Sequence, residues 1–187
     1  TYDNDKSVNE IIKKNKLSDE IFNNVGDAVK NSDLVIIATP ISSFEKVLNS
    51  IEGNLKIGSI LTDTCSVKTG VSKIFEKKNL KNSTCIPGHP VAGIENSGPE
   101  AGFADLFKNR WTILTPSKKI DGEAIKKLSS FWESMGSKVK IMTDEDHDKI
   151  LTFTSHLPHV IAYNIVKTSM SNDASVKDDI IKYSAGG

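Results

Sequence analysis

Short apolar runs alternate with amphipathic stretches over most of the chain. Continuous apolar runs at 34–38 and 57–61 are typical of parallel strands that are covered on both faces. Between them, apolar residues of 44–51 recur at helical spacing. Residues 1–3 are expected to be the last residues of a strand, and further strands are expected at 84–87, 111–114 and 139–142. Further helices are expected at 67–78 and 124–135. Alternating strands and helices predict an α/β fold with a doubly wound parallel sheet.

The pattern changes at about residue 144. Residues 145–170 are expected to form one long helix, with no strand after it. We therefore expect an incomplete Rossmann-like, dinucleotide-binding domain over 1–143 and the start of an all-helical domain over 144–187. The chain begins without Met and closes on a glycine-rich segment, so we expect a fragment that lacks both ends, including the first βα unit.

Composition narrows the class of protein. The 24 basic and 24 acidic residues balance, which gives no electrostatic case for nucleic acid or an anionic membrane. No apolar run approaches the roughly 20 residues needed to span a bilayer, and the first residues lack a signal-peptide pattern. Cys65 and Cys85 are too few for a disulfide framework or a zinc site. We expect a cytoplasmic protein without a metal.

Polar residues gather at the predicted carboxyl ends of strands, where open α/β sheets bind ligands. Asp3, Thr39, Pro40 and Asp63 are the expected cofactor contacts. An acid at the position of Asp3 can accept the ribose hydroxyls of NAD and repel a 2′-phosphate, so we expect NAD, with NADP as the alternative. Asp3 could instead be a surface or capping residue, with Asn4 and Asp5 as other ribose contacts.

The glycine- and proline-rich stretch 88–111 begins with His89 between Gly88 and Pro90. We interpret it as a strand that ends and delivers the histidine into a cleft, followed by a long loop of the kind that is usually functional. The alternative is a plain connection with a hydrogen-bonded histidine inside it. Ser66 can cap a helix or reach a substrate, whereas Lys68 is expected to be solvated or to be a helix-turn charge.

The long helix carries a polar stripe with steps of three and four residues. Its members are Asp148, Thr152, Ser155, His156 and His159. Such a stripe on an apolar helix faces a cavity or solvent. We do not expect metal binding by His156 and His159, since no carboxylate or cysteine completes a site at these spacings.

Three segments resemble one enzyme family. They are GHPVAGIENSGPEAGFADLFKNRWTILTP at 88–116, DTCSVK at 63–68 and SHLPH at 155–159. Together they are similar to the prephenate and cyclohexadienyl (arogenate) dehydrogenases, in the family's order and across nearly the whole chain. The resemblance implies NAD(P)-dependent oxidative decarboxylation of prephenate or arogenate, to 4-hydroxyphenylpyruvate or tyrosine, in tyrosine biosynthesis by a homodimer.

The resemblance also implies roles for residues. His89, Ser66 and His156 would be catalytic, with His89 within one water of Ser66 and facing the helix that carries His156. The substrate-binding residues would be Ser155, His159 and Glu95, the last near the substrate's side chain. The arginine that binds a substrate carboxylate in the family would lie beyond Gly187, so the fragment alone is expected to be inactive. Arg110 is expected to pair with Glu100 or Asp105.

Two other classes of function stay open. One is another enzyme with a Rossmann-like and a helical domain, such as a 3-hydroxyacid dehydrogenase, which would use a lysine on the long helix. The other is a non-catalytic ligand-sensing or dimerisation module. The presence of His89, Ser66 and His156 together argues against the second class.

Overall fold

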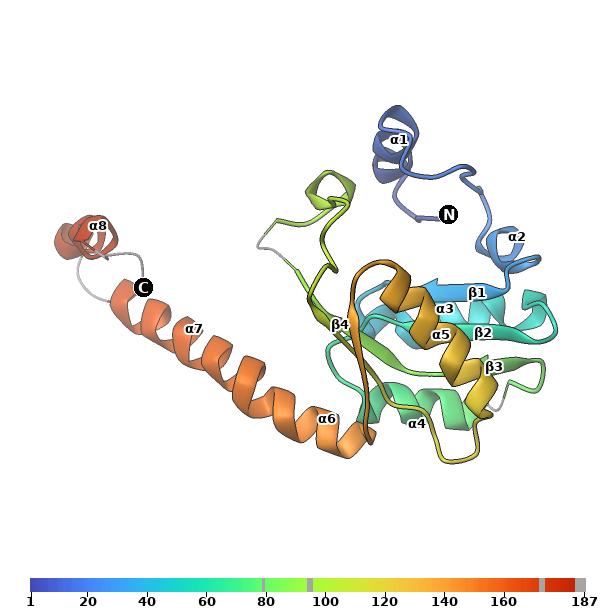
Figure 1. Cartoon of the computed structure of the whole chain (residues 1–187). Coiled ribbons are helices and arrows are strands. Elements are labelled where there is room, and N and C mark those ends of the chain that lie inside the picture. The colour runs from blue at the N-terminus through green and yellow to red at the C-terminus, as the bar shows by residue number, and fades with distance from the viewer. Residues whose placement is uncertain (79, 94–95, 172–173, 184–187) are drawn as a thin grey trace. The chain divides into compact units, whose positions relative to one another are not determined.

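The computed structural model describes residues 1–78, 80–93, 96–171 and 174–183 (Figure 1). The chain divides into two compact units, Thr1–His147 and Asp148–Gly187, which are described separately.

The first unit contains two three-stranded sheets, of which the first is entirely parallel. Its strands in spatial order are β1 (Leu34–Ile37), β2 (Ser59–Asp63) and β3 (Ser83–Cys85). The crossovers run through helix α3 (Ile41–Ile51) and helix α4 (Thr69–Lys78). The predicted parallel strands at 34–38 and 57–61 are therefore confirmed, and so is the Rossmann-like α/β class.

The second sheet departs from the parallel pattern. Its strands in spatial order are β4 (Gly88–Val91), β5 (Trp111–Leu114) and β6 (Lys138–Ile141). Strand β5 is parallel to β6 but antiparallel to β4. Parallel neighbours need a crossover back to the same end of the sheet, usually through a helix. No such helix is found in the described part of the connection from β4 to β5, which contains only the short turn η2 (Pro99–Ala101).

Strands β3 and β4 link the two sheets. The Ile86 amide donates to the Leu61 carbonyl at 2.9 Å, so the chain continues along the edge of β2 after β3 ends. Beyond that point β4 pairs with β5 instead. Figure 1 shows β3 and β4 following each other through the middle of the unit. Hydrogen bonds to β2 before Gly88, and to β5 from Gly88 onward, therefore hold the segment that carries His89.

The remaining elements of the first unit are α1 (Lys6–Lys14), α2 (Val25–Val29), η1 (Glu52–Asn54) and α5 (Gly122–Ser134).

The N-terminal segment differs from its prediction. The expected strand at 1–3 is wrong, because the Thr1 carbonyl accepts from the Phe22 amide and the Asp3 carbonyl from the Asn9 side chain, and neither partner is in a strand. Asp5 caps α1, and its carboxylate accepts from the Ser7 hydroxyl at 2.7 Å and from the Ser7 amide at 2.8 Å. These two hydrogen bonds lower the pKa of Asp5.

Each sheet has its own apolar core. On the first sheet, Phe44 and Leu48 of α3 are completely buried, and the Phe44 ring meets Phe75 edge to face at 5.4 Å between centroids. On the second, Leu114 packs with Leu128 and Trp132 of α5. These apolar faces hold the helices against the strands, so the strand ends form a rigid frame.

The C-terminal helical segment is continuous but not uniform. It consists of α6 (Asp144–Leu151), the π-helical turn η3 (Thr152–His156) and α7 (Leu157–Met170), and α8 (Ala174–Tyr183) follows. Pro158 explains the wide turn, since it has no amide hydrogen and its ring would clash with the carbonyl four residues earlier. None of the described helices has the length and apolar character needed to cross a bilayer.

We predict that Leu48→Ala lowers the free energy of unfolding by about 2–5 kcal/mol, because it removes a fully buried side chain from the first core. Leu17→Ala is the matched control, since Leu17 is exposed and should change stability by less than about 0.5 kcal/mol. Urea unfolding of both variants measures the difference. Equal losses would mean that α3 is not packed on this sheet.

Candidate functional site

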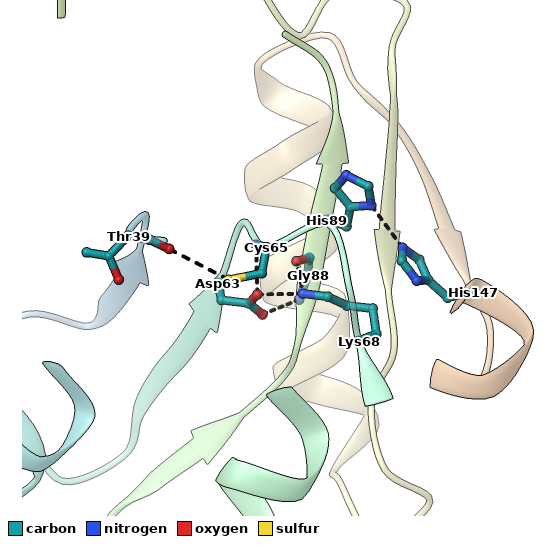
Figure 2. Close-up of polar contacts among 7 residues, drawn as sticks. All are labelled: Thr39, Asp63, Cys65, Lys68, Gly88, His89 and His147. Atoms are coloured by element: carbon teal, nitrogen blue, oxygen red, sulfur yellow. Dashed lines mark hydrogen bonds and ion pairs between the residues drawn. The ribbon is translucent and has the colours of Figure 1, made fainter. Parts of the chain in front are cut away.

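The end of β2 carries a buried carboxylate. Asp63 accepts hydrogen bonds from Lys68 Nζ at 2.5 Å and from the Cys65 amide at 2.9 Å, both through Oδ2. Its Oδ1 accepts from the Gly88 amide at 2.9 Å. Asp63 therefore uses both oxygens to connect the loop after β2 with the first residue of β4 (Figure 2).

Lys68 is buried, and the prediction of a solvated lysine is wrong. Its side chain has no exposed surface, and Nζ donates to the Gly88 carbonyl at 2.5 Å as well as to Asp63. Helix α4 begins only at Thr69, so Lys68 belongs to the loop after β2 and not to a solvated helix turn. Two desolvated charges are tolerable because each has several hydrogen-bond partners.

Gly88 permits this close approach. A Cβ at this position would lie 2.9 Å from the Thr62 hydroxyl and 3.1 Å from the Asp63 carbonyl oxygen. The backbone of β4 must therefore pass directly over the end of β2, where only glycine fits without displacement. We call Asp63, Lys68 and Gly88 together the Asp63–Lys68 clamp. It fixes the residue that precedes His89.

His89 lies within β4 and contacts a second histidine. The expected strand ended before Gly88, but pairing with β5 continues the strand through His89, which is opposite Ile113. The His89 side chain is nearly buried, and Nδ1 lies 2.9 Å from Nε2 of His147 on α6. The ring centroids are 5.1 Å apart at an interplanar angle of 66°. Figure 2 shows the second ring nitrogen of His89 directed away from His147.

His147 was missing from the expected site residues, although it is completely buried. It lies among acidic residues, Asp146 and Asp148, and is not part of the polar stripe that the sequence predicted. A signal was nevertheless present, since Leu151 is one helical turn later and is also buried. Residues four apart share a helix face, so a histidine in register with a buried leucine indicates an inward side chain.

The loops after β1 and β2 lie together. The Thr64 amide donates to the Ile37 carbonyl at 3.3 Å, and Cys65 Sγ lies 3.8 Å from the Thr39 carbonyl oxygen. The Thr39 hydroxyl is buried and has no hydrogen-bond partner among the residues that the structure describes. Pro40 occupies the N-cap position of α3. These strand ends form one edge, as expected for Thr39, Pro40 and Asp63.

Ser66 and Asp3 have different surroundings. Ser66 is exposed and lies three residues before the first residue of α4, too early to cap it. Asp3 accepts a hydrogen bond from the Asp5 amide at 2.8 Å within the N-terminal segment. Their expected ligand contacts stay predictions.

The thiols near this edge are not nucleophiles at neutral pH. Burial raises the pKa of Cys65 to about 11, and the nearby charge of Asp63 adds to the increase. Burial also raises the pKa of Cys85 to about 12. Both side chains therefore remain protonated thiols, which are poor nucleophiles. His89 is the better candidate for proton transfer.

The second unit contains the remaining predicted residues. His159 Nδ1 lies 2.7 Å from the Ser155 carbonyl oxygen, and His156 is half-buried at the end of the π turn. A π turn adds about one residue per turn to the helix, so residues on either side of it do not share the face that a regular α-helix would provide. The predicted stripe therefore does not continue unchanged from Asp148 to His159.

Two other predictions concern the long loop. Glu95 lies outside the described residues. Among the described residues, Arg110 has no ion-pair partner, and Asp105 pairs with Lys108 instead at 3.5 Å. The Arg110 backbone carbonyl accepts from the Lys138 amide at 2.7 Å, so this residue supports the sheet through its main chain. In the part of the chain that the structure describes, no group of three His, Cys, Asp or Glu side chains could hold a metal.

We predict that Lys68→Met lowers the free energy of unfolding by about 3–5 kcal/mol, because it leaves the Asp63 charge buried without its cation. Lys56→Met is the matched control. Lys56 pairs with Asp33 at 2.6 Å, but this pair is exposed, so its loss should cost less than about 1 kcal/mol. Chemical denaturation of both variants measures the effect, and similar small losses would contradict the clamp.

The chain matches two models of one protein family. Residues 1–141 match a family model described as "Prephenate dehydrogenase, nucleotide-binding domain". Residues 143–187 match "Prephenate dehydrogenase, dimerization domain". Both matches together extend over nearly the whole chain.

Curated relatives carry related names. The chain is 38% identical over 185 residues to a cyclohexadienyl dehydrogenase of Zymomonas mobilis, covering 99% of this chain and 63% of the relative. It is 29% identical to a prephenate dehydrogenase of Bacillus subtilis, covering 85% and 43%. The chain therefore spans less than two thirds of the length of these relatives.

Solved structures give the same result. A prephenate dehydrogenase from Aquifex aeolicus, in complex with hydroxyphenyl propionate and NAD+, is similar with a TM-score of 0.86 and 30% identity, covering 100% of this chain and 64% of that one. An arogenate dehydrogenase from Synechocystis has a TM-score of 0.79 and 26% identity, covering 98% and 65%. On this evidence the chain belongs to the prephenate dehydrogenase family.

Proposed function

We propose that the complete protein is an NAD-dependent dehydrogenase that oxidises and decarboxylates prephenate or arogenate in tyrosine biosynthesis. Family membership supports the reaction class. One observation of this chain carries the proposal, namely a nearly buried histidine, His89, held at the end of the sheet by a second histidine. The free thiols Cys65 and Cys85 agree with a proposed cytoplasmic location.

The substrate has a hydroxyl at C4 of a cyclohexadiene and a carboxylate at C1. When bound, NAD+ accepts the hydride that leaves C4. His89 receives the proton of the 4-hydroxyl. Carbon dioxide leaves C1, its bonding electrons make the ring aromatic, and the proton returns from His89 to the phenolate oxygen at C4. An imidazole titrates near neutral pH, which suits a general base in this step. Because Nδ1 of His89 faces His147, its other nitrogen, Nε2, is the proposed acceptor.

The edge formed by β1 and β2 fits a dinucleotide in two respects. No described residue hydrogen-bonds the buried Thr39 hydroxyl, so it is a polar group that a ligand would satisfy. The loops at Pro40 and Thr64 lie at the carboxyl ends of parallel strands, where such cofactors bind. Asp3 would hold the ribose. Asp63 is already used by the clamp, so its proposed contribution is to place the loop against the cofactor.

The remaining predicted residues complete the proposal. Ser66 would share the substrate hydroxyl with His89, and its exposed position leaves it accessible. His156, Ser155 and His159 would line the substrate or nicotinamide side, and Glu95 would influence the choice between prephenate and arogenate. Residues 144–187 would begin the helical domain that forms a homodimer. Exposed apolar side chains on α7, such as Val160 and Ile165, support such a contact.

The direct test is NADH formation and carbon dioxide release by the complete protein, with prephenate and arogenate assayed separately. We expect turnover with at least one of them. A protein that reduces NAD+ with neither substrate, yet oxidises a simple 3-hydroxyacid, would belong to the alternative class of dehydrogenases. Binding of either substrate without turnover would indicate a sensing module.

We predict that His89→Asn in the complete protein lowers kcat by about 10²–10⁴-fold, the usual contribution of a general base. Substrate binding should change far less, because the change affects the transition state most. The dependence of kcat on a group that titrates near neutrality should also disappear. Steady-state kinetics over a range of pH measure all three effects.

The opposite pattern would overturn this role. If His89→Asn keeps nearly normal kcat and only weakens binding, His89 positions the substrate. The base would then have to be sought at His156 or in solvent.

We predict that the complete protein prefers NAD over NADP, and that Asp3→Asn reduces this preference about tenfold, because it removes a charged hydrogen-bond acceptor from the ribose. Asp5→Asn is the matched control, since Asp5 caps α1 and should affect mainly stability. Comparing kcat/KM for both cofactors tests this. An unchanged preference in Asp3→Asn, with a change in Asp5→Asn, would move the ribose contact to Asp5.

A further inference from the structure

We propose that His147 is a positioning residue that holds the ring of His89 and determines which of its nitrogens carries the proton. The inference rests on the proposed function, in which His89 accepts the substrate proton. Its basis is the 2.9 Å contact between His89 Nδ1 and His147 Nε2. His147 has no exposed surface, so it acts on the reaction through His89.

The contact constrains the tautomers of both rings. A neutral imidazole has one N–H donor and one acceptor nitrogen, and a hydrogen bond between two rings requires one of each. If His147 Nε2 donates, His89 Nδ1 accepts and the His89 proton must be on Nε2, which then cannot accept another. If His89 Nδ1 donates, His89 Nε2 is left as a base. Only the second arrangement permits the proposed proton transfer.

The favourable arrangement requires His147 to be neutral and to carry its own proton on Nδ1. Burial disfavours the charged form of an imidazole, and His147 is completely buried. After His89 takes a proton at Nε2, its Nδ1–H still donates to His147, and a charged donor strengthens that hydrogen bond. His147 thus stabilises His89 both before and after proton transfer.

The rings are held by a common frame. The His147 amide donates to the Thr143 carbonyl at 3.0 Å in the first turn of α6. Just before it, the Met142 amide donates to the Leu114 carbonyl of β5 at 3.2 Å. Strand β5 is also the hydrogen-bonded neighbour of β4, which carries His89. Both rings therefore stand on elements attached to one strand, which limits their relative motion.

Two substitutions separate hydrogen bonding from packing. His147→Leu removes the acceptor, whereas the amide oxygen of His147→Gln can accept near the position of Nε2. In the complete protein we expect His147→Leu to lower kcat by about 10–100-fold, the loss typical when an outer partner that orients a histidine is removed. KM should change by less than about threefold. His147→Gln should recover most of kcat.

A double-mutant cycle tests the coupling. In a His89→Asn background, His147→Leu should cause no further loss of kcat, because the group it orients is gone. The proposal is overturned if His147→Leu keeps normal kcat, or if its loss persists unchanged in the His89→Asn background. It is also overturned if His147→Gln is as impaired as His147→Leu.

The tautomer can be read without turnover. Nitrogen-15 NMR of the histidine rings in the complete wild-type protein should show His89 protonated at Nδ1. In the His147→Leu variant, a larger share of molecules should carry the His89 proton on Nε2. Protonation of wild-type His89 at Nε2 alone would overturn the inference, even if His147→Leu does not fold. Inactivity of the wild type with both substrates would instead refute the proposed function, whichever tautomer is found.

Discussion

The ion pair between Asp63 and Lys68 has no exposed side-chain surface, and both partners bind the backbone of Gly88. Because a buried charge without its partner is strongly destabilising, the loop after β2 and the start of β4 must stay together. Gly88 lets the two backbones approach closely enough for this contact. The passage from one sheet to the other is therefore rigid at the residue just before His89.

The candidate site follows from that rigidity. His89 extends from a strand whose first residue is clamped and whose other residues pair with β5. A fixed backbone leaves ring orientation as the main freedom of the side chain, and the contact with His147 removes it. A histidine partner differs from the carboxylate that often orients a catalytic histidine, because it can accept the Nδ1 hydrogen without being an anion itself.

The parts of the fold that depend on local sequence patterns could be predicted from the sequence. The strands at β1 and β2 are continuous apolar runs, and their parallel pairing follows from the intervening helix. The antiparallel strand β4 could not be predicted in the same way, because its direction depends on a long connection. The burial of Lys68 depends on Asp63 and Gly88, which are 5 and 20 residues away in the chain. The spacing of polar and apolar residues does not reveal such partners. Pro158 could have indicated the π turn. The polar residues around it recur at regular helical spacing, which predicted a uniform helix instead.

The most direct test of the central claim is a crystal structure of the complete protein with NAD+ and a 4-hydroxyphenyl ligand. We expect the ligand's 4-oxygen to lie within hydrogen-bond distance of His89 Nε2, while Nδ1 of the same ring still contacts His147. A ligand whose 4-oxygen lies far from His89, or a His89 ring that has turned away from His147 to meet it, would contradict the account.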